Sequence, residues 1–138
     1  MAIKSPFLSF LSILSPIIVG LFIYTLFRGI PLLHSKSLMP SPIHNPLLSV
    51  CVYNLPDALW LFALLQSFKV IWRSELYSKG LPWVCVSIAG AILSEYAQKL
   101  HVIPGTFDLL DIAAYMNATA IFILLNTTIF INQNKFSV

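Results

Sequence analysis

Charged side chains are scarce in this chain. Lysine, arginine, aspartate and glutamate together make up 9% of its 138 residues, whereas a soluble domain carries roughly 25%. Hydrophobic residues make up 58%, and the mean hydropathy is +0.86. A water-soluble fold of this size could not cover so much apolar surface with so few polar groups. The composition therefore excludes a soluble domain and predicts a membrane protein with the lipid bilayer around most of its surface.

Cysteines are few, and recognisable catalytic motifs are missing. Cys51 and Cys85 are expected near opposite faces of the bilayer, whereas a disulfide needs Cα atoms within about 7 Å. Two such positions form neither a metal site nor a redox motif, so we expect no metal and no cofactor. The sequence has no nucleophile–histidine–acid triad, metal-ligand spacing or phosphate-binding loop. Whether the protein is an enzyme is left open.

A basic patch is also missing. The eight lysines and arginines stand singly between apolar runs, although they give the chain a net charge of +3. We interpret them as topology signals and contacts with lipid head groups. We therefore expect no nucleic-acid partner.

Four apolar segments are long enough to cross the hydrocarbon core, which takes about 20 helical residues. They predict an all-α polytopic membrane protein, a four-helix transmembrane bundle forming a single domain over residues 1–138. The expected spans are residues 6–27, 55–73, 82–100 and 107–131. The first is much longer than a signal-peptide core of about 7–15 residues, so we expect it to be retained.

Turn and cap residues set the expected helix boundaries. Asn54 is the expected N-cap of the second span, with Pro56 in its first turn. The apolar stretch 46–53 before it is expected to be a re-entrant or surface segment. The helix is expected to continue beyond the membrane to about Lys79, with Gly80 as its C-cap glycine. Three further features are expected: a loop from Ile30 to Pro46, a third span opening at Pro82, and Thr106 as N-cap of the fourth.

The distribution of basic residues predicts the orientation. The N-terminus, second loop and tail hold five lysines and arginines (Lys4, Lys69, Arg73, Lys79 and Lys135), and the other loops hold three (Arg28, Lys36 and Lys99). Cytoplasmic loops carry the excess of such residues, which favours both termini in the cytoplasm.

Four of the five acidic residues are expected near one membrane face. With antiparallel spans, the start of the second, the end of the third and the start of the fourth meet the same face, extracytoplasmic by the charge count. This brings together Asp57, Glu95, Asp108 and Asp111, while Glu75 belongs to the opposite loop. Glu95 lies six residues before His101, or roughly 9 Å along the helix. Charged residues at such depth cost free energy and normally face a bundle interior or a wet cavity.

Helical spacing places several polar residues on facing sides of the third and fourth spans. The short link between the two spans makes them neighbours, so we expect a shared outer pocket. The candidate ligand-binding residues are Asp57, Glu95, Gln98, Asp108, Asp111 and Tyr115.

Structural roles remain open for some of these residues. Asp108 and Asp57 are each also compatible with a capping role at a helix start. Glu95 is compatible with a structural hydrogen bond to a neighbouring helix, or with an ion pair to Lys99 four residues later.

The motif around these acids resembles a known family. Glu95-Tyr-Ala-Gln98, followed by PGTFDLLD ending at Asp111, resembles the VanZ-like proteins, small bacterial membrane proteins, over about residues 94–118. The arginine usual in the family's turn is missing between Pro104 and Asp111, and Tyr115 stands where an asparagine is expected. The resemblance implies a cell-envelope protein of the bacterial cytoplasmic membrane.

Two hypotheses of different classes follow. The first is a VanZ-like envelope protein that binds a lipid-linked or amphiphilic ligand at the outer carboxylate pocket. The alternative is a non-catalytic accessory subunit of a larger membrane complex, in which the acids would pair with basic residues of other membrane protein subunits.

Overall fold

The structure is a computed structural model, which describes residues 6–28 and 46–134. It forms four α-helices: α1 (Pro6–Arg28), α2 (Pro46–Trp72), α3 (Leu81–Lys99) and α4 (Leu109–Asn134). A 3₁₀ turn, η1 (Arg73–Glu75), and a π turn, η2 (Leu76–Gly80), join α2 to α3. The described residues contain no strand, and the prediction of an all-α fold is confirmed.

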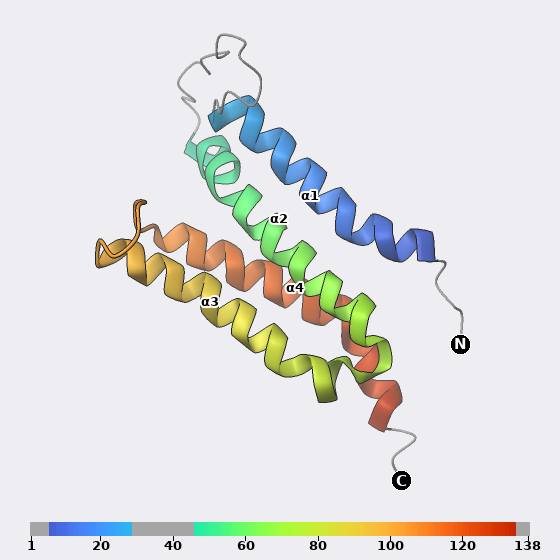
Figure 1. The fold of residues 1–138 in the computed structure, drawn as a ribbon. Helices are drawn as coiled ribbons and strands as arrows, with labels where there is room; N and C mark the ends of the chain where they lie inside the picture. Colours follow the sequence, from blue (N-terminus) through green and yellow to red (C-terminus); the bar gives the residue numbers. More distant parts are fainter. Residues whose placement is uncertain (1–5, 29–45, 135–138) are drawn as a thin grey trace.

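Three helical segments are long and apolar enough to cross a membrane. They are Phe7–Phe27, Ser49–Lys99 and Leu109–Asn126. The middle segment has 51 residues because the helical backbone continues from α2 through both turns into α3. Figure 1 shows that the chain reverses direction at these turns, so that α2 and α3 run antiparallel.

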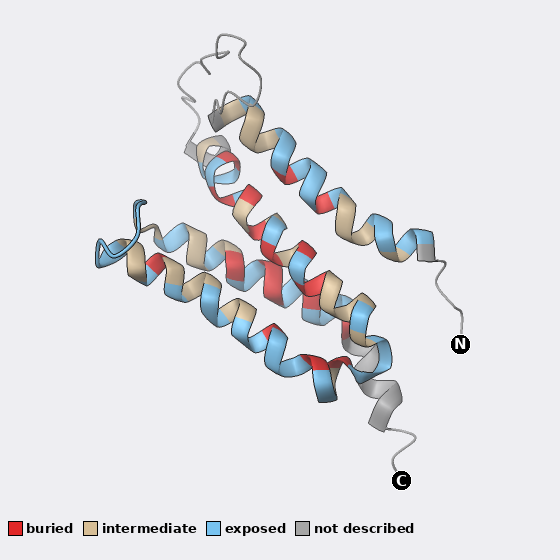
Figure 2. Cartoon of the chain, in the orientation of Figure 1, coloured by how far each residue is buried: buried red, intermediate tan, exposed pale blue. Residues whose placement is uncertain are grey.

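The second helix, α2, occupies the centre of the molecule. It packs against α1 on one side and α4 on the other, and it also contacts α3. Within the described residues, α1 makes no extensive contact with α3 or α4. Figure 2 accordingly shows buried residues concentrated on α2 and on the facing side of α4, while most of α1 is exposed.

Packing between α1 and α2 depends on Gly20. A Cβ atom at Gly20 would lie 2.9 Å from two atoms of the Trp60 indole and 3.4 Å from the carbonyl oxygen of Pro56. Small residues let apolar helices approach closely, so Gly20 sets the distance between these two helices.

The buried core lies between α2, η2, α3 and α4. Its members are Leu61, Leu65, Leu76, Val84, Tyr115 and Phe122. At the hairpin end of the core, the rings of Trp72 and Trp83 stack with centroids 6.2 Å apart. This aromatic contact holds the end of α2 against the start of α3.

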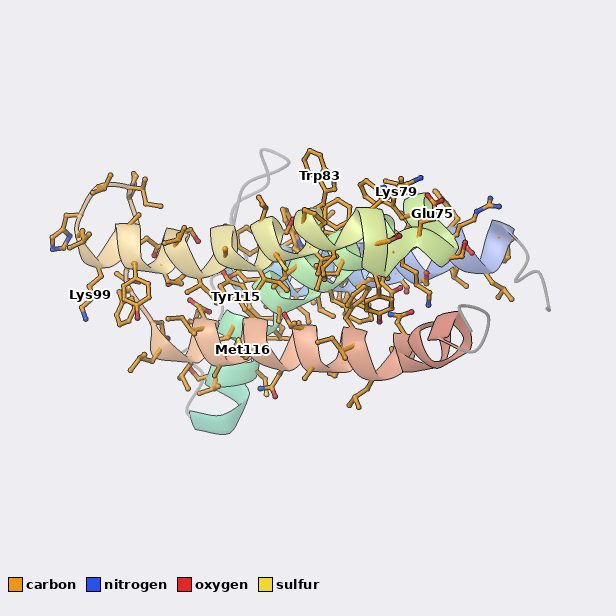
Figure 3. All side chains as sticks on the ribbon, turned by 90° about the horizontal axis from the view of Figure 1, so that it is seen from below. Glu75, Lys79, Trp83, Lys99, Tyr115 and Met116 are labelled. Atoms are coloured by element: carbon orange, nitrogen blue, oxygen red, sulfur yellow. The ribbon has the colours of Figure 1, made fainter. Side chains whose placement is uncertain are left out.

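The start of α2 differs from the prediction. The helix begins at Pro46, so residues 46–53 are the first turns of α2 and not a separate segment, and Asn54 is not an N-cap. Pro56 is buried inside the helix, where it lacks an N–H for the carbonyl of Val52 and its ring crowds that carbonyl. The first turns of α2 are tilted against the rest in Figures 1 and 3, as expected for a proline kink.

Other boundaries also differ. The α-helical part of α2 ends at Trp72, and Gly80 has a right-handed φ of −82° and precedes α3, so it is not a C-cap glycine. The helix α4 begins at Leu109, and its N-cap is Asp108 rather than Thr106. The expected ranges of the first span and the Pro82 start of the third agree with the structure. Of the predicted loop from Ile30 to Pro46, Pro46 is instead the first residue of α2, and residues 30–45 lie outside the described residues, as do Lys4 and Lys135.

Candidate ligand-binding site

Three helix ends meet at one end of the molecule: the start of α2, the end of α3 and the start of α4 (Figure 1). They bring together the acidic residues Asp57, Glu95, Asp108 and Asp111, which we call the carboxylate cluster. Asp57, Glu95 and Asp108 all lie close enough to Asp111 to interact with it electrostatically. The proximity predicted for Glu95 and Asp111 agrees with this arrangement.

Glu95 is the most deeply buried acid, with only 3% of its surface exposed. One carboxylate oxygen accepts from the Gln98 amide at 3.5 Å, and the other from the backbone N–H of Asp108 at 3.4 Å. The Tyr115 phenol, which lies between α3 and α4 in Figure 3, also hydrogen-bonds Glu95. The bonds from Gln98 and Asp108 are long, because most such bonds span about 2.7–3.2 Å. Glu95 is therefore enclosed by polar partners but held by weak contacts.

Asp111 is joined to α2 by a short hydrogen bond. The Asn54 amide nitrogen donates to Oδ1 of Asp111 at 2.8 Å, and Asn54 itself is buried with 5% exposure. Because the Pro56 kink follows directly, it determines how the turn bearing Asn54 is presented to α4. This bond ties the first turns of α2 to the start of α4.

Asp108 has two roles in the structure. Its Oδ1 accepts from the backbone N–H of Leu110 at 2.8 Å, which caps the start of α4. Its own N–H donates to Glu95. The capping role considered from the sequence is therefore confirmed, and the cap also connects α4 to Glu95 on α3. The corresponding reading of Asp57 is wrong, because Asp57 lies in the interior of α2.

A tight turn fixes the end of α3. The N–H of Val102 donates to the carbonyl of Ala97 at 2.9 Å and that of His101 to Gln98 at 3.0 Å, the pattern of a Schellman motif. His101 occupies the left-handed position, with φ +56°. Gly105 has φ +141°, and a Cβ there would overlap the Gln98 side chain. The turn therefore holds Gln98 beside Glu95.

The lysine nearest in sequence to the clustered acids contacts an aromatic ring and, in the described part of the chain, not a carboxylate. The Lys99 ammonium lies 5.0 Å from the centroid of the Phe107 ring, and no ion pair joins it to Glu95 among the described side chains. The Lys79–Glu75 ion pair, at 3.0 Å, is at the opposite end of the molecule (Figure 3). Within the described residues, no lysine or arginine pairs with Glu95, Asp108 or Asp111.

A polar cavity of about 250 Å³ opens beside the carboxylate cluster. Carboxyl, amide and hydroxyl groups line most of it: the residues are Ser49, Val50, Tyr53, Asn54, Thr106, Asp108, Leu110 and Asp111. The carboxylate oxygens of Asp108 and Asp111 accept hydrogen bonds, so the cavity suits a group that donates them.

An apolar groove of about 460 Å³ runs between α2 and α4. Its walls include Leu55, Ala58, Leu59 and Phe62 from α2, and Ala113, Ala114, Ala118 and Ile121 from α4. Three residues, Val50, Asn54 and Leu110, line both the groove and the polar cavity. The two spaces are therefore adjacent, with Asn54 at their junction.

Only some of the predicted site residues line the polar cavity. Asp108 and Asp111 line the polar cavity, whereas Glu95, Gln98 and Tyr115 support the cluster from the α3–α4 interface. Sequence reasoning missed Asn54 as a site residue because it was assigned to a helix cap. It also missed the cavity wall formed by the first turns of α2. An alternative reading of Pro56 as a mid-helix kink would have placed both in the site.

Among the described residues, no group of three or more histidines, cysteines, aspartates and glutamates could hold a metal ion. The four acids are therefore near one another without converging on a single point. No protein-family model, curated protein or solved structure matches the chain.

Proposed function

We propose that this protein is an integral membrane protein that binds an amphiphile. The amphiphile's head group would occupy the polar cavity and its hydrocarbon chain the apolar groove. The observation that carries the proposal is the continuity of the two spaces through Val50, Asn54 and Leu110. An amphiphile has this same division, one polar end and one apolar length. The volume of the groove is within the range of about 300–1,000 Å³ usual for small-molecule sites.

In this proposal all four helices cross the bilayer as a bundle. At 1.5 Å per residue, even α3 with 19 residues is about 29 Å long, close to the hydrocarbon thickness of about 30 Å. The antiparallel course of α2 and α3 supports two crossings by the middle apolar segment. The carboxylate cluster then lies near one membrane surface. By the positive-inside rule this is the extracytoplasmic surface, and both termini are cytoplasmic.

The head group is proposed to carry hydrogen-bond donors, as an amine or a cluster of hydroxyls does. Carboxylates accept hydrogen bonds and do not donate them when ionised. A positively charged amine also gains from the neighbouring negative charges. The VanZ-like motif over residues 94–118 contains three of the four clustered acids. It supports a place for this protein in a bacterial cell envelope.

The test measures binding of a fluorescent long-chain alkylamine to the purified full-length protein in nanodiscs of zwitterionic lipid. Asp111→Ala removes the cavity carboxylate bonded to Asn54, so it should weaken binding roughly ten- to hundredfold, the loss expected for one charge-assisted hydrogen bond. Glu75→Ala is the matched control, because it removes an exposed acid at the far end. A long-chain carboxylate should bind both proteins poorly.

Equal binding to wild type and Asp111→Ala would contradict the proposed site. A stoichiometric protein that co-purifies in mild detergent and is lost from Asp111→Ala would instead indicate the accessory-subunit role. Native mass spectrometry of the same preparations distinguishes these results, because a bound amphiphile and a bound subunit differ greatly in mass.

A further inference from the structure

Asn117 is a polar residue in an otherwise apolar environment. It lies at the middle of the apolar segment Leu109–Asn126 of α4. Its side chain is exposed and lines the apolar groove among alanines and Ile121. No hydrogen bond joins this side chain to another residue in the described part of the chain.

The other polar side chains along this stretch of α4 each bond another group of the protein, although Oδ1 of the buried Asn126 has no partner in the described part of the chain. Asp111 accepts from Asn54, and Tyr115 bonds Glu95. Thr119 donates to the carbonyl of Tyr115 at 2.8 Å, and Asn126 to the carbonyl of Phe122 at 2.6 Å. Asn117 differs because it faces the groove and not the protein interior. Its amide is therefore available to an occupant of the groove.

Leaving that amide unbonded in hydrocarbon is unfavourable, because a buried polar group without a partner loses its bonds to water. A saturated chain in the groove could not supply a partner. A chain that carries an amide, ester or hydroxyl at the right depth could. An amide partner would use both the donor and the acceptor of the Asn117 side chain.

The spacing along α4 gives the distance of Asn117 from the polar cavity. Leu110, at the junction of the cavity and groove, and Asn117 are seven residues apart, two helical turns on the same face of α4. This corresponds to about 10 Å along the helix. We infer that Asn117 selects amphiphiles with a hydrogen-bonding group in the chain about 10 Å from the head group. The inference rests on the proposed function, and it assigns to Asn117 a specificity role at the same site.

The experiment compares two alkylamine probes of equal length in nanodiscs. One has an amide in its chain about 10 Å from the amine, and the other has only methylene groups. Wild type should bind the amide probe about three- to tenfold more tightly, the change expected for one hydrogen bond. Asn117→Leu should lose this preference and bind the two probes with equal affinity. Met116→Leu is the matched control, because Met116 is exposed on α4 and does not line the groove.

The outcomes separate the inference from the proposed function. If wild type binds both probes equally, the specificity role is wrong and amphiphile binding stands. If neither probe binds, the proposed function itself fails. If wild type is dimeric in nanodiscs, Asn117→Leu is monomeric and no probe preference is found, a second copy fills the groove and the inference is overturned. Asn117 makes no side-chain hydrogen bond within residues 6–28 and 46–134, so Asn117→Leu should keep the wild-type unfolding temperature.

Discussion

Replacing Asp111 by asparagine removes one negative charge from the carboxylate cluster and keeps an acceptor oxygen for Asn54. The side chains have nearly the same shape, so the 2.8 Å hydrogen bond between α2 and α4 can persist. Asp111 interacts electrostatically with Asp57, Glu95 and Asp108. The substitution therefore tests whether the negative charge of Asp111 raises or lowers the unfolding free energy.

Two opposing effects set the expected change in unfolding free energy. Like charges about 7 Å apart repel by roughly 2 kcal/mol at an effective dielectric constant of about 20. A hydrogen bond to a charged acceptor stabilises by about 1 kcal/mol more than one to a neutral acceptor. Removing the repulsion should outweigh weakening the bond. We expect Asp111→Asn to be more stable than wild type by about 1 kcal/mol, or roughly 3–6 °C in the unfolding temperature.

The assay is thermal unfolding in detergent micelles at pH 8, followed by tryptophan fluorescence, together with alkylamine binding in nanodiscs. Higher stability and weaker amine binding in the same variant would show that the Asp111 carboxylate contributes to ligand binding and lowers the stability of the fold. Glu75→Gln is the control for charge in general, and it should change neither quantity by much because that acid is exposed. A clear loss of stability in Asp111→Asn would refute the reasoning and make Asp111 a structural residue.

Three further predictions concern the elements that shape the site. Pro56→Ala restores a helix-interior N–H and should straighten α2; the distance between spin labels at Val50 and Leu64 should then lengthen, and alkylamine binding should weaken. Gly20→Leu places a side chain against Trp60 and should lower the unfolding free energy by about 1–3 kcal/mol through overpacking, measured by thermal unfolding. His101→Gly relieves a left-handed conformation and should raise the unfolding free energy by about 1 kcal/mol in the same assay. An unchanged label distance, wild-type stability of Gly20→Leu, or a destabilised His101→Gly would contradict the corresponding structural interpretation.

Composition and spacing predicted the features that depend on local sequence. The scarcity of charge predicted apolar helices, and Pro82 correctly indicated the start of α3. The short link after Lys99 and the helical spacing of acids predicted that Glu95 and Asp111 would be close. These predictions succeeded because a short connection between antiparallel helices leaves few alternative arrangements.

The form of α2 could not be predicted in the same way. Proline is compatible with the first turn of a helix and also with a kink inside an apolar helix. Asn54 followed by Pro56 matched the first pattern, but packing against α1 and α4 places both residues within a longer helix. Ser49, Val50 and Tyr53 consequently form part of the cavity wall.

The exposure of Asn117 also depends on tertiary packing. Its position in the sequence places it on a stripe of α4 with Leu110 and Ala114, but the stripe could equally have faced α2 or α3. Only the arrangement of α2 beside α4 shows that this stripe borders a groove. Periodicity identifies residues that share a face, whereas the neighbours of that face come from the fold.

The most direct test of amphiphile binding is photolabelling in nanodiscs with an alkylamine that carries a diazirine in its chain, followed by peptide mapping. The proposed mode of binding predicts adducts on groove residues of α2 and α4, such as Phe62, Ala113 and Ile121, and their loss when excess unlabelled amine is added. Labelling spread evenly over the exposed surface of α1 and α3, and unaffected by the competitor, would contradict it.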